Sequence, residues 1–131
     1  MRRPMNPPAA PPPKGPYSIA VEASGGRLLF MTGQVSKDAA GHLVGEGDPA
    51  AQARQIVANL RSIAAAAGGS LSDIASWTWY DTDIAAHREA LRNAFTEAFP
   101  DADYPAFTRV QVVALERAEY LMKADAIAVL A

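Results

Sequence analysis

The stretch YPAFTRVQVVAL, from Tyr104 to Leu115, carries a single charge, Arg109, inside an apolar run that favours a β-strand. A guanidinium in such a run needs an anion, because an uncompensated charge is costly to remove from water. Side chains alternate between the two faces of a strand, so Phe107 and Arg109 are expected on one face. Arg109 is therefore a candidate contact for an anionic substrate group, and a structural ion pair is the alternative.

Asp81 is a second charge in a strand-like segment, WTWYD, where alternation gives it the same face as Trp77 and Trp79. The two tryptophans are expected in the core or an interface rather than as a platform for stacking bases. We expect Asp81 to reach solvent at the strand end. The alternative is a buried carboxylate with a partner such as Arg109, Lys123 or a cationic substrate. Without a partner, Asp81 would be a candidate general acid or base.

The composition limits the kinds of function. A chain of 131 residues, half of them apolar and a fifth charged, is typical of one globular domain. A net charge of -2 offers no basic excess for nucleic acid or an anionic membrane. The chain has no cysteine, which excludes thiol nucleophiles, disulfides and thiolate metal sites, and it fits a reducing compartment; we expect a cytoplasmic protein.

The two histidines do not suggest a metal site. His42 and His87 are too far apart in sequence to indicate a ligand pair, so we expect no metal and no cofactor. We assign His42 to a turn and His87 to the exposed first turn of a helix.

The N-terminal segment is dense in proline. We expect residues 1–14 to form an extended or disordered tail, with a proline-motif ligand as the less favoured alternative, and residues 15–131 to form one domain. The paired arginines of MRRPM are not followed by an apolar run, so we expect neither a signal peptide nor a transmembrane span.

Apolar spacing and turn residues predict the elements of the domain. Asp48 and Asp83 are predicted as helix N-caps, and Gly68 and Pro100 as helix ends. The predicted order is a hairpin over 27–44, a helix over 49–67, a strand within 73–83, a helix over 84–99, and strands over 106–113 and 120–129. This β-β-α-β-α-β-β order indicates an α+β sheet with two helices on one face. Because the other face also has apolar candidates, we expect oligomerisation.

Most of the chain, from Gly15 onward, resembles the Rid family of reactive intermediate deaminases, also called YjgF or endoribonuclease L-PSP. The segments that carry the resemblance are GPYSIAVEA, LLFMTGQVSKDAAGHLVGEGD, AQARQIVANLRSIAAAAGGSLSDI, TDIAAHREALRNAF, and YPAFTRVQV with DAIAV. The resemblance implies a chorismate-mutase-like α+β fold. It also implies a homotrimer in which three sheets enclose a barrel, with three clefts between subunits.

The resemblance also implies an activity. In active members an arginine of a P-A-R-S strand binds the substrate carboxylate. A glutamate at the start of an E-I-E-A-I-A strand helps position water, which hydrolyses an imine or enamine derived from an amino acid and releases ammonia. The cleft also uses a tyrosine of GPYS, a hydroxyl residue before GQ, and a helix asparagine. These three positions match Tyr17, Thr32 before Gly33, and Asn93.

The two positions closest to the chemistry depart from the family pattern. Phe107 stands at the arginine position, and Arg109 on the same face is displaced along the strand by roughly 6–7 Å. Phe107 would narrow the cleft or offer a stacking surface, and Arg109 would contact an anion or form an ion pair across the trimer interface.

Lys123 stands at the glutamate position and reverses its charge. It is a candidate base or Schiff-base lysine if desolvated, or an anion-binding group. A structural salt bridge is the third alternative, with Asp125, Glu119 or Glu116 as the partner.

We therefore expect a Rid-family hydrolase of non-standard specificity that acts on a small imine, enamine or related carbonyl metabolite in inter-subunit clefts. The catalytic candidates are Tyr17, Lys123 and Asp81, and the substrate-binding candidates are Arg109, Thr32, Asn93, Phe107 and Gly33. A non-catalytic trimeric protein that binds a small ligand is the alternative. An endoribonuclease is a weaker one, because the net charge does not favour RNA. The expected partners are a small molecule and further copies of the chain, with no membrane and no nucleic acid.

Overall fold

The structure is a computed structural model that describes residues 2–131. Its elements are β1 (Arg2–Met5), β2 (Ala20–Ala23), β3 (Arg27–Gln34), α1 (Pro49–Ala66), a 3-10 turn (Leu71–Asp73), β4 (Ile74–Asp81), α2 (Ile84–Ala98), β5 (Ala106–Gln111) and β6 (Met122–Leu130). The four-stranded sheet has the order β3-β6-β4-β5, and β1 pairs with β2 in a separate two-stranded sheet. The predicted α+β class is confirmed.

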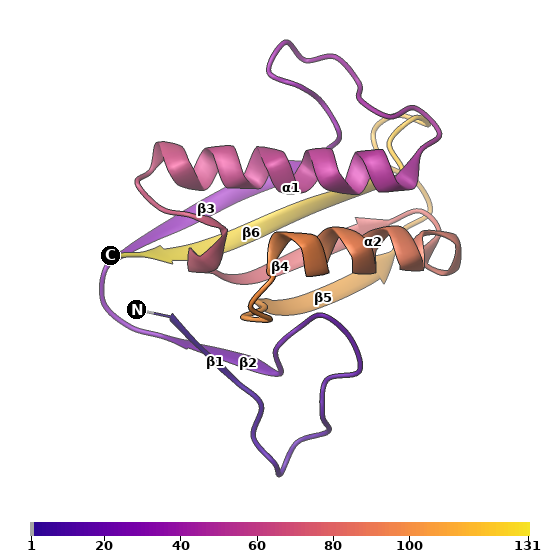
Figure 1. Ribbon diagram of the computed structural model, residues 1–131. Coiled ribbons are helices and arrows are strands. Elements are labelled where there is room, and N and C mark those ends of the chain that lie inside the picture. Colours follow the sequence, from indigo (N-terminus) through magenta and orange to yellow (C-terminus); the bar gives the residue numbers. More distant parts are fainter. Residues whose placement is uncertain (1) are drawn as a thin grey trace.

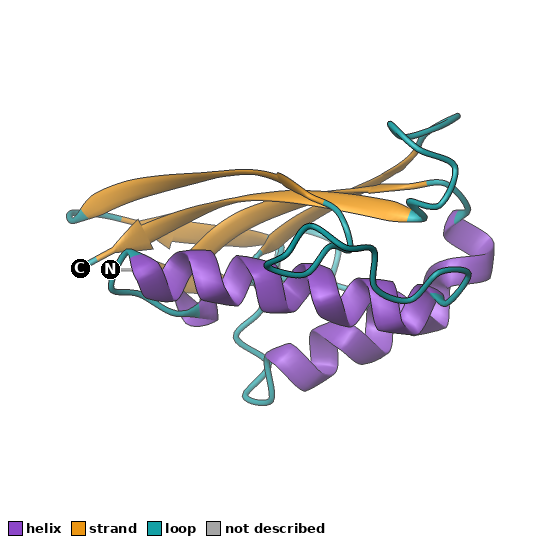
Figure 2. Ribbon diagram, turned by 90° about the horizontal axis from the view of Figure 1, so that it is seen from above, coloured by secondary structure: helices purple, strands orange, loops and turns teal. Residues whose placement is uncertain are grey.

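Both helices cover the same face of the four-stranded sheet, as Figures 1 and 2 show. The pair β4 and β5 is parallel and is connected through α2, whereas β3 and β4 pair antiparallel with the central β6. A parallel pair needs such a crossover, and α2 supplies it. The edge strand β5 therefore lies beneath α2, with one row of its side chains facing the helix.

The core lies between the sheet and the helices and is built around two tryptophans of β4. Trp77 and Trp79 are buried and pair across the sheet with Ala126 and Ala124 of β6, whose small side chains leave room for the rings. The Trp77 ring packs 4.5 Å from that of Phe95 on α2, measured between centroids. Their predicted place in the core is confirmed.

The helix starts agree with the sequence prediction. Asp48 precedes α1 and accepts a 3.1 Å hydrogen bond from the amide of Ala51. Asp83 does the same for α2 through the amide of Ala86, also at 3.1 Å. These bonds satisfy amides that have no partner within the helix. The caps fix where each helix begins, and thereby which of its residues face the sheet.

The predicted hairpin over 27–44 is only half correct. Its first strand is β3, but the following segment returns through a single bridge between Lys37 and Leu43, and β3 pairs with β6 instead. The carboxylate of Asp38 accepts hydrogen bonds of 2.9 Å from the amides of Ala40 and His42. This local turn competes with strand pairing and makes the segment a loop.

Residues 2–5 of the expected extended or disordered tail are extended, and they form β1 against β2. The buried guanidinium of Arg2 anchors the strand by donating to the carbonyl oxygens of Ile74 at 2.5 Å and Asp103 at 2.6 Å. Desolvation lowers the pKa of this guanidinium. The side chain of Asn6 accepts a 2.8 Å bond from the amide of Ile19, which closes the proline-dense segment into a loop. That loop carries one wall of the pocket described below.

The face of the sheet away from the helices is uncovered and partly apolar. Large apolar side chains are exposed there on three strands: Leu28 (61%), Phe30 (70%), Val110 (39%) and Ile127 (38%). Isolated exposed apolar residues are common, but a group on one sheet face indicates an interaction surface.

Within residues 2–131, no helix has both the length and the apolar character needed to cross a bilayer.

Candidate functional site

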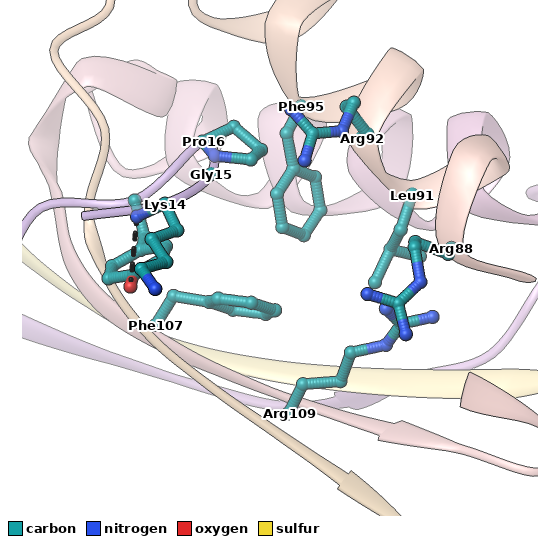
Figure 3. Close-up of a pocket in the computed structure, with 10 residues that line it drawn as sticks. Lys14, Gly15, Pro16, Arg88, Leu91, Arg92, Phe95, Phe107 and Arg109 are labelled. Atoms are coloured by element: carbon teal, nitrogen blue, oxygen red, sulfur yellow. Dashed lines mark hydrogen bonds between the residues drawn. The ribbon is translucent and has the colours of Figure 1, made fainter. Parts of the chain in front are cut away.

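A pocket lies between β5, α2 and the loop that precedes β2 (Figure 3). Its cavity volume is about 180 Å³. It is lined by Lys14, Gly15, Pro16, Tyr17, Arg88, Leu91, Arg92, Phe95, Phe107 and Arg109. The lining thus combines four basic side chains with a floor of aromatic and aliphatic groups.

Three local patterns bring these side chains together. Alternation on β5 points Phe107 and Arg109 to the same side, as predicted, and the pocket confirms it. On α2, the lining residues are spaced i, i+3, i+4 and i+7, which is one edge of a helix. They are Arg88, Leu91, Arg92 and Phe95. The loop side is held by Ser18, whose hydroxyl donates to the carbonyl of Tyr104 at 2.6 Å.

Phe107 forms the aromatic floor of the pocket. Its ring lies 6.2 Å from that of Tyr17 and 5.2 Å from that of Phe95, and the second pair is edge to face at 89°. Both geometries are ordinary for interacting aromatic rings. At the position where the family resemblance implies an arginine, this chain presents a packed apolar surface.

Asp81 is fully buried, so the expected exposure at the strand end is wrong. Its Oδ2 accepts hydrogen bonds from Arg109 Nη2 at 2.7 Å and Nε at 3.2 Å. Its Oδ1 lies 2.6 Å from Nδ1 of His87 and accepts a 2.9 Å hydrogen bond from the backbone amide of Asp83. The Nη2 of Arg109 also donates to the carbonyl of Ile84 at 3.1 Å. The alternative partner named from the sequence, Arg109, is the one found.

His87 is buried, which corrects its predicted place in an exposed first turn. The buried face of α2 runs through His87, Leu91, Ala94 and Phe95 and therefore begins with a polar residue. The apolar pattern alone could not reveal that start. His42 lies in the exposed loop between Asp38 and Leu43, as expected.

Lys123 lies on the opposite face of the sheet from the pocket. Its neighbours in β6, Met122 and Ala124, are buried under the helices, so alternation directs Lys123 outward. Its Nζ donates to Oε2 of Glu116 at 2.5 Å, which is one of the three salt bridges proposed from the sequence. A Cβ at Gly33 would come within 2.5 Å of the Cε of Lys123, so the glycine is what lets the lysine cross β3.

Charges and hydroxyls continue along this outer face. The carboxylate of Asp125 accepts a 3.1 Å hydrogen bond from the phenol of Tyr80, and this bond raises the pKa of Tyr80. Thr32 is exposed on β3 next to Gly33. The outer face of the sheet therefore holds the groups around Lys123, separate from those around Arg109.

Asn93 is exposed on α2 and does not line the pocket. The structure thus groups Tyr17, Phe107 and Arg109, and places Asp81 behind Arg109. Sequence reasoning missed Arg88 and Arg92, although their four-residue spacing was a usable signal once a helix was predicted. Lys14, in the expected tail, was also missed.

No group of three or more histidine, aspartate or glutamate side chains in residues 2–131 lies close enough together to hold a metal ion.

Replacing Arg109 by Met should destabilise the fold by about 3 kcal/mol, because it leaves the carboxylate of Asp81 buried without its cation. Urea unfolding measures this. Adding Asp81→Asn to Arg109→Met should restore part of the loss, because the amide is neutral and still offers an oxygen to His87. A double variant that is less stable than Arg109→Met would contradict this account of the pair.

Replacing Lys123 by Met should raise the pKa of Glu116, because the hydrogen bond from Lys123 holds that pKa below its usual range. NMR titration of side-chain carboxyl groups measures it. Gly33→Ala should act in the same direction by displacing the lysine. The lowered pKa of Asp38 depends first on the amide of His42 and should stay unchanged in both variants.

Comparison with known proteins identifies the family of the chain. Residues 7–130 match the family model described as Endoribonuclease L-PSP. Protein DfrA of Myxococcus xanthus is 37% identical, over 92% of this chain and 89% of its own length. The 3-aminoacrylate deaminase RutC of Acinetobacter baylyi is 33% identical over 81% of both chains. A structure of the conserved Rid family protein YyfB of Yersinia pestis superposes with a TM-score of 0.90 at 34% identity, covering 98% of both chains. The chain belongs to the Rid family, whose model carries the description Endoribonuclease L-PSP.

Proposed function

We propose that the protein is a hydrolase of the deaminase type that releases ammonia from a small imine, an enamine or a related metabolite carrying an anionic group. The main support is the pocket that Tyr17, Phe107 and Arg109 share with further cations. The similarity to RutC of Acinetobacter baylyi, a protein named as a 3-aminoacrylate deaminase, points to the same class of reaction.

The proposed reaction adds water to the carbon of the C=N bond. The resulting carbinolamine then loses ammonia and leaves a carbonyl compound, while the water's protons pass to nitrogen. The phenol oxygen of Tyr17 accepts a 3.3 Å hydrogen bond from the amide of Lys14, so its own proton is directed elsewhere. In the proposal Tyr17 donates this proton to the C=N nitrogen as water adds, and the phenolate regains a proton from the added water. Arg109 holds the anionic group, and the buried Asp81 acts as a positioning residue for Arg109.

We propose that three copies assemble through the uncovered sheet face. The exposed side chains of Phe30 and Leu28 supply apolar area for such an interface. Assembly would place Lys123, Gly33 and Thr32 of one subunit against a neighbour, where the lysine can contribute a second cation to a shared cleft. Thr32 and Asn93 remain candidates for holding a carbonyl or water.

A second candidate is a trimeric binding protein without catalysis. It is favoured by Phe107 and Lys123, which stand where the family resemblance implies an arginine and a glutamate. RNA cleavage, which the family description names, is not favoured by the net charge of -2.

Ammonia release tests the activity, using 2-imino acids generated in place by an amino-acid oxidase. Wild type should accelerate release above the spontaneous rate, and Tyr17→Phe should slow it by about a hundredfold if the phenol transfers the proton. Tyr104→Phe, a matched change at a tyrosine outside the pocket, should leave the rate unchanged. A wild type without activity on any imine, but with stoichiometric ligand binding, would support the binding protein instead.

Light scattering tests the assembly, and wild type should have the mass of a trimer. Phe30→Asp should dissociate it, because the charge would be buried in the interface. Ala65→Asp introduces the same charge at an exposed position of α1 and should leave the mass unchanged. A monomeric wild type at micromolar concentration would rule out the assembly.

A further inference from the structure

The pocket beside Arg109 holds an excess of positive charge. Four of its lining residues are basic, and no aspartate or glutamate is among the lining residues. The charge of Arg109 is compensated by the buried carboxylate of Asp81 behind it. Lys14, Arg88 and Arg92 make no ion pair with any side chain in residues 2–131. The net charge of the pocket therefore comes from these three side chains.

Arg109 contributes hydrogen-bond donors in a fixed orientation more than it contributes net charge. Its Nε and Nη2 are occupied by Asp81 and by the carbonyl of Ile84. Its Nη1 makes no hydrogen bond within the described part of the chain, and the side chain is 13% exposed. The guanidinium is thus held rigidly, with donors left for a ligand.

The uncompensated cations are distributed around an apolar floor. Figure 3 shows Lys14 at one end of the pocket, Arg88 and Arg109 at the other, and Phe107 between them. On the α2 side, Leu91 and Phe95 are 2% and 1% exposed. An apolar floor lowers the local dielectric constant, which strengthens both the repulsion among the cations and their attraction to an anion.

We propose that this pocket selects ligands with two separated negative charges over ligands with one. A single carboxylate compensates one end and leaves the repulsion at the other. A dianion with a short apolar backbone compensates both ends while its chain lies on Phe107. This proposal names the substrate class of the site in the proposed function and rests on that function for its catalytic meaning, but binding can be tested without turnover.

Titration calorimetry with succinate and butyrate, which have equal chain length, tests the selection. Wild type at low ionic strength should bind succinate at least about tenfold more tightly than butyrate, and salt should weaken succinate binding more. Glycerol 3-phosphate tests a phosphate group as the source of the two charges, which it places at one end. Its tight binding with weak succinate binding would replace the dicarboxylate by a phosphate ester and overturn the separation of charges. Equal affinities for all three compounds would overturn the proposal.

Two variants on α2 locate the effect. Arg88 and Arg92 are exposed and form no ion pair within residues 2–131, so Arg88→Gln and Arg92→Gln should keep the fold. Each should weaken succinate binding by about fivefold and butyrate binding less. Arg61→Gln removes the same charge from an exposed position of α1 outside the pocket. It should leave both affinities unchanged, and an equal loss there would show an effect of overall charge.

Failure of this inference differs from failure of the proposed function. Selective succinate binding without ammonia release from any imine would keep the dianion site and overturn the hydrolase. Equal ammonia release from imines of monocarboxylic and dicarboxylic amino acids would keep the hydrolase and overturn the selection.

Discussion

The pairing of one buried carboxylate with one arginine determines how the rest of the site is arranged. Asp81 is at the end of β4 and Arg109 is in the neighbouring edge strand, so their hydrogen bonds join the two parallel strands beneath α2. The same carboxylate contacts His87 in the first turn of that helix. A carboxylate in this position must be fully hydrogen-bonded, because burial without partners would cost several kcal/mol. The strands and the helix are thereby held in one relative position, which is the position that forms the pocket.

In this arrangement, the arginine of β5 and the other cations of the pocket have different roles. The family resemblance implies an arginine that holds substrate directly, two residues before Arg109. Here the arginine is tied to the protein behind it, and aromatic packing around Phe107 fills the vacated place. The net positive charge of the pocket then comes from side chains that no internal carboxylate neutralises. Those side chains lie on α2 and on the loop closed by β1.

Sequence reasoning predicted what depends on short-range rules. Both helix caps, the alternation of β4, and the shared face of Phe107 and Arg109 follow from spacing within a few residues, and the structure has them. The partner of Asp81 depends on which strand lies beside β4, and this was open from the sequence. The sequence prediction placed His87 in an exposed turn because the first buried residue of α2 is polar and does not continue the apolar pattern.

Other errors had a common physical origin. β1 was hidden in a proline-dense segment, because its stability comes from Arg2 reaching carbonyl groups far away in sequence. Lys14, in the same proline-dense segment, lines the pocket. Arg88 and Arg92 looked like an ordinary solvated helix edge, and only the loop packed opposite turns this edge into a wall.

The position of Arg88 and Arg92 on an exposed edge of α2 has a consequence for how such proteins diverge. Their side chains contribute charge to the pocket but no buried surface to the core. Substitutions there can change the attraction for a ligand with little effect on folding stability. The tied Asp81 and Arg109 are constrained in the opposite way, because a change in either one leaves the other uncompensated. Substitutions at the exposed edge of the pocket can therefore change its ligand preference, while the buried pair of Asp81 and Arg109 stays the same.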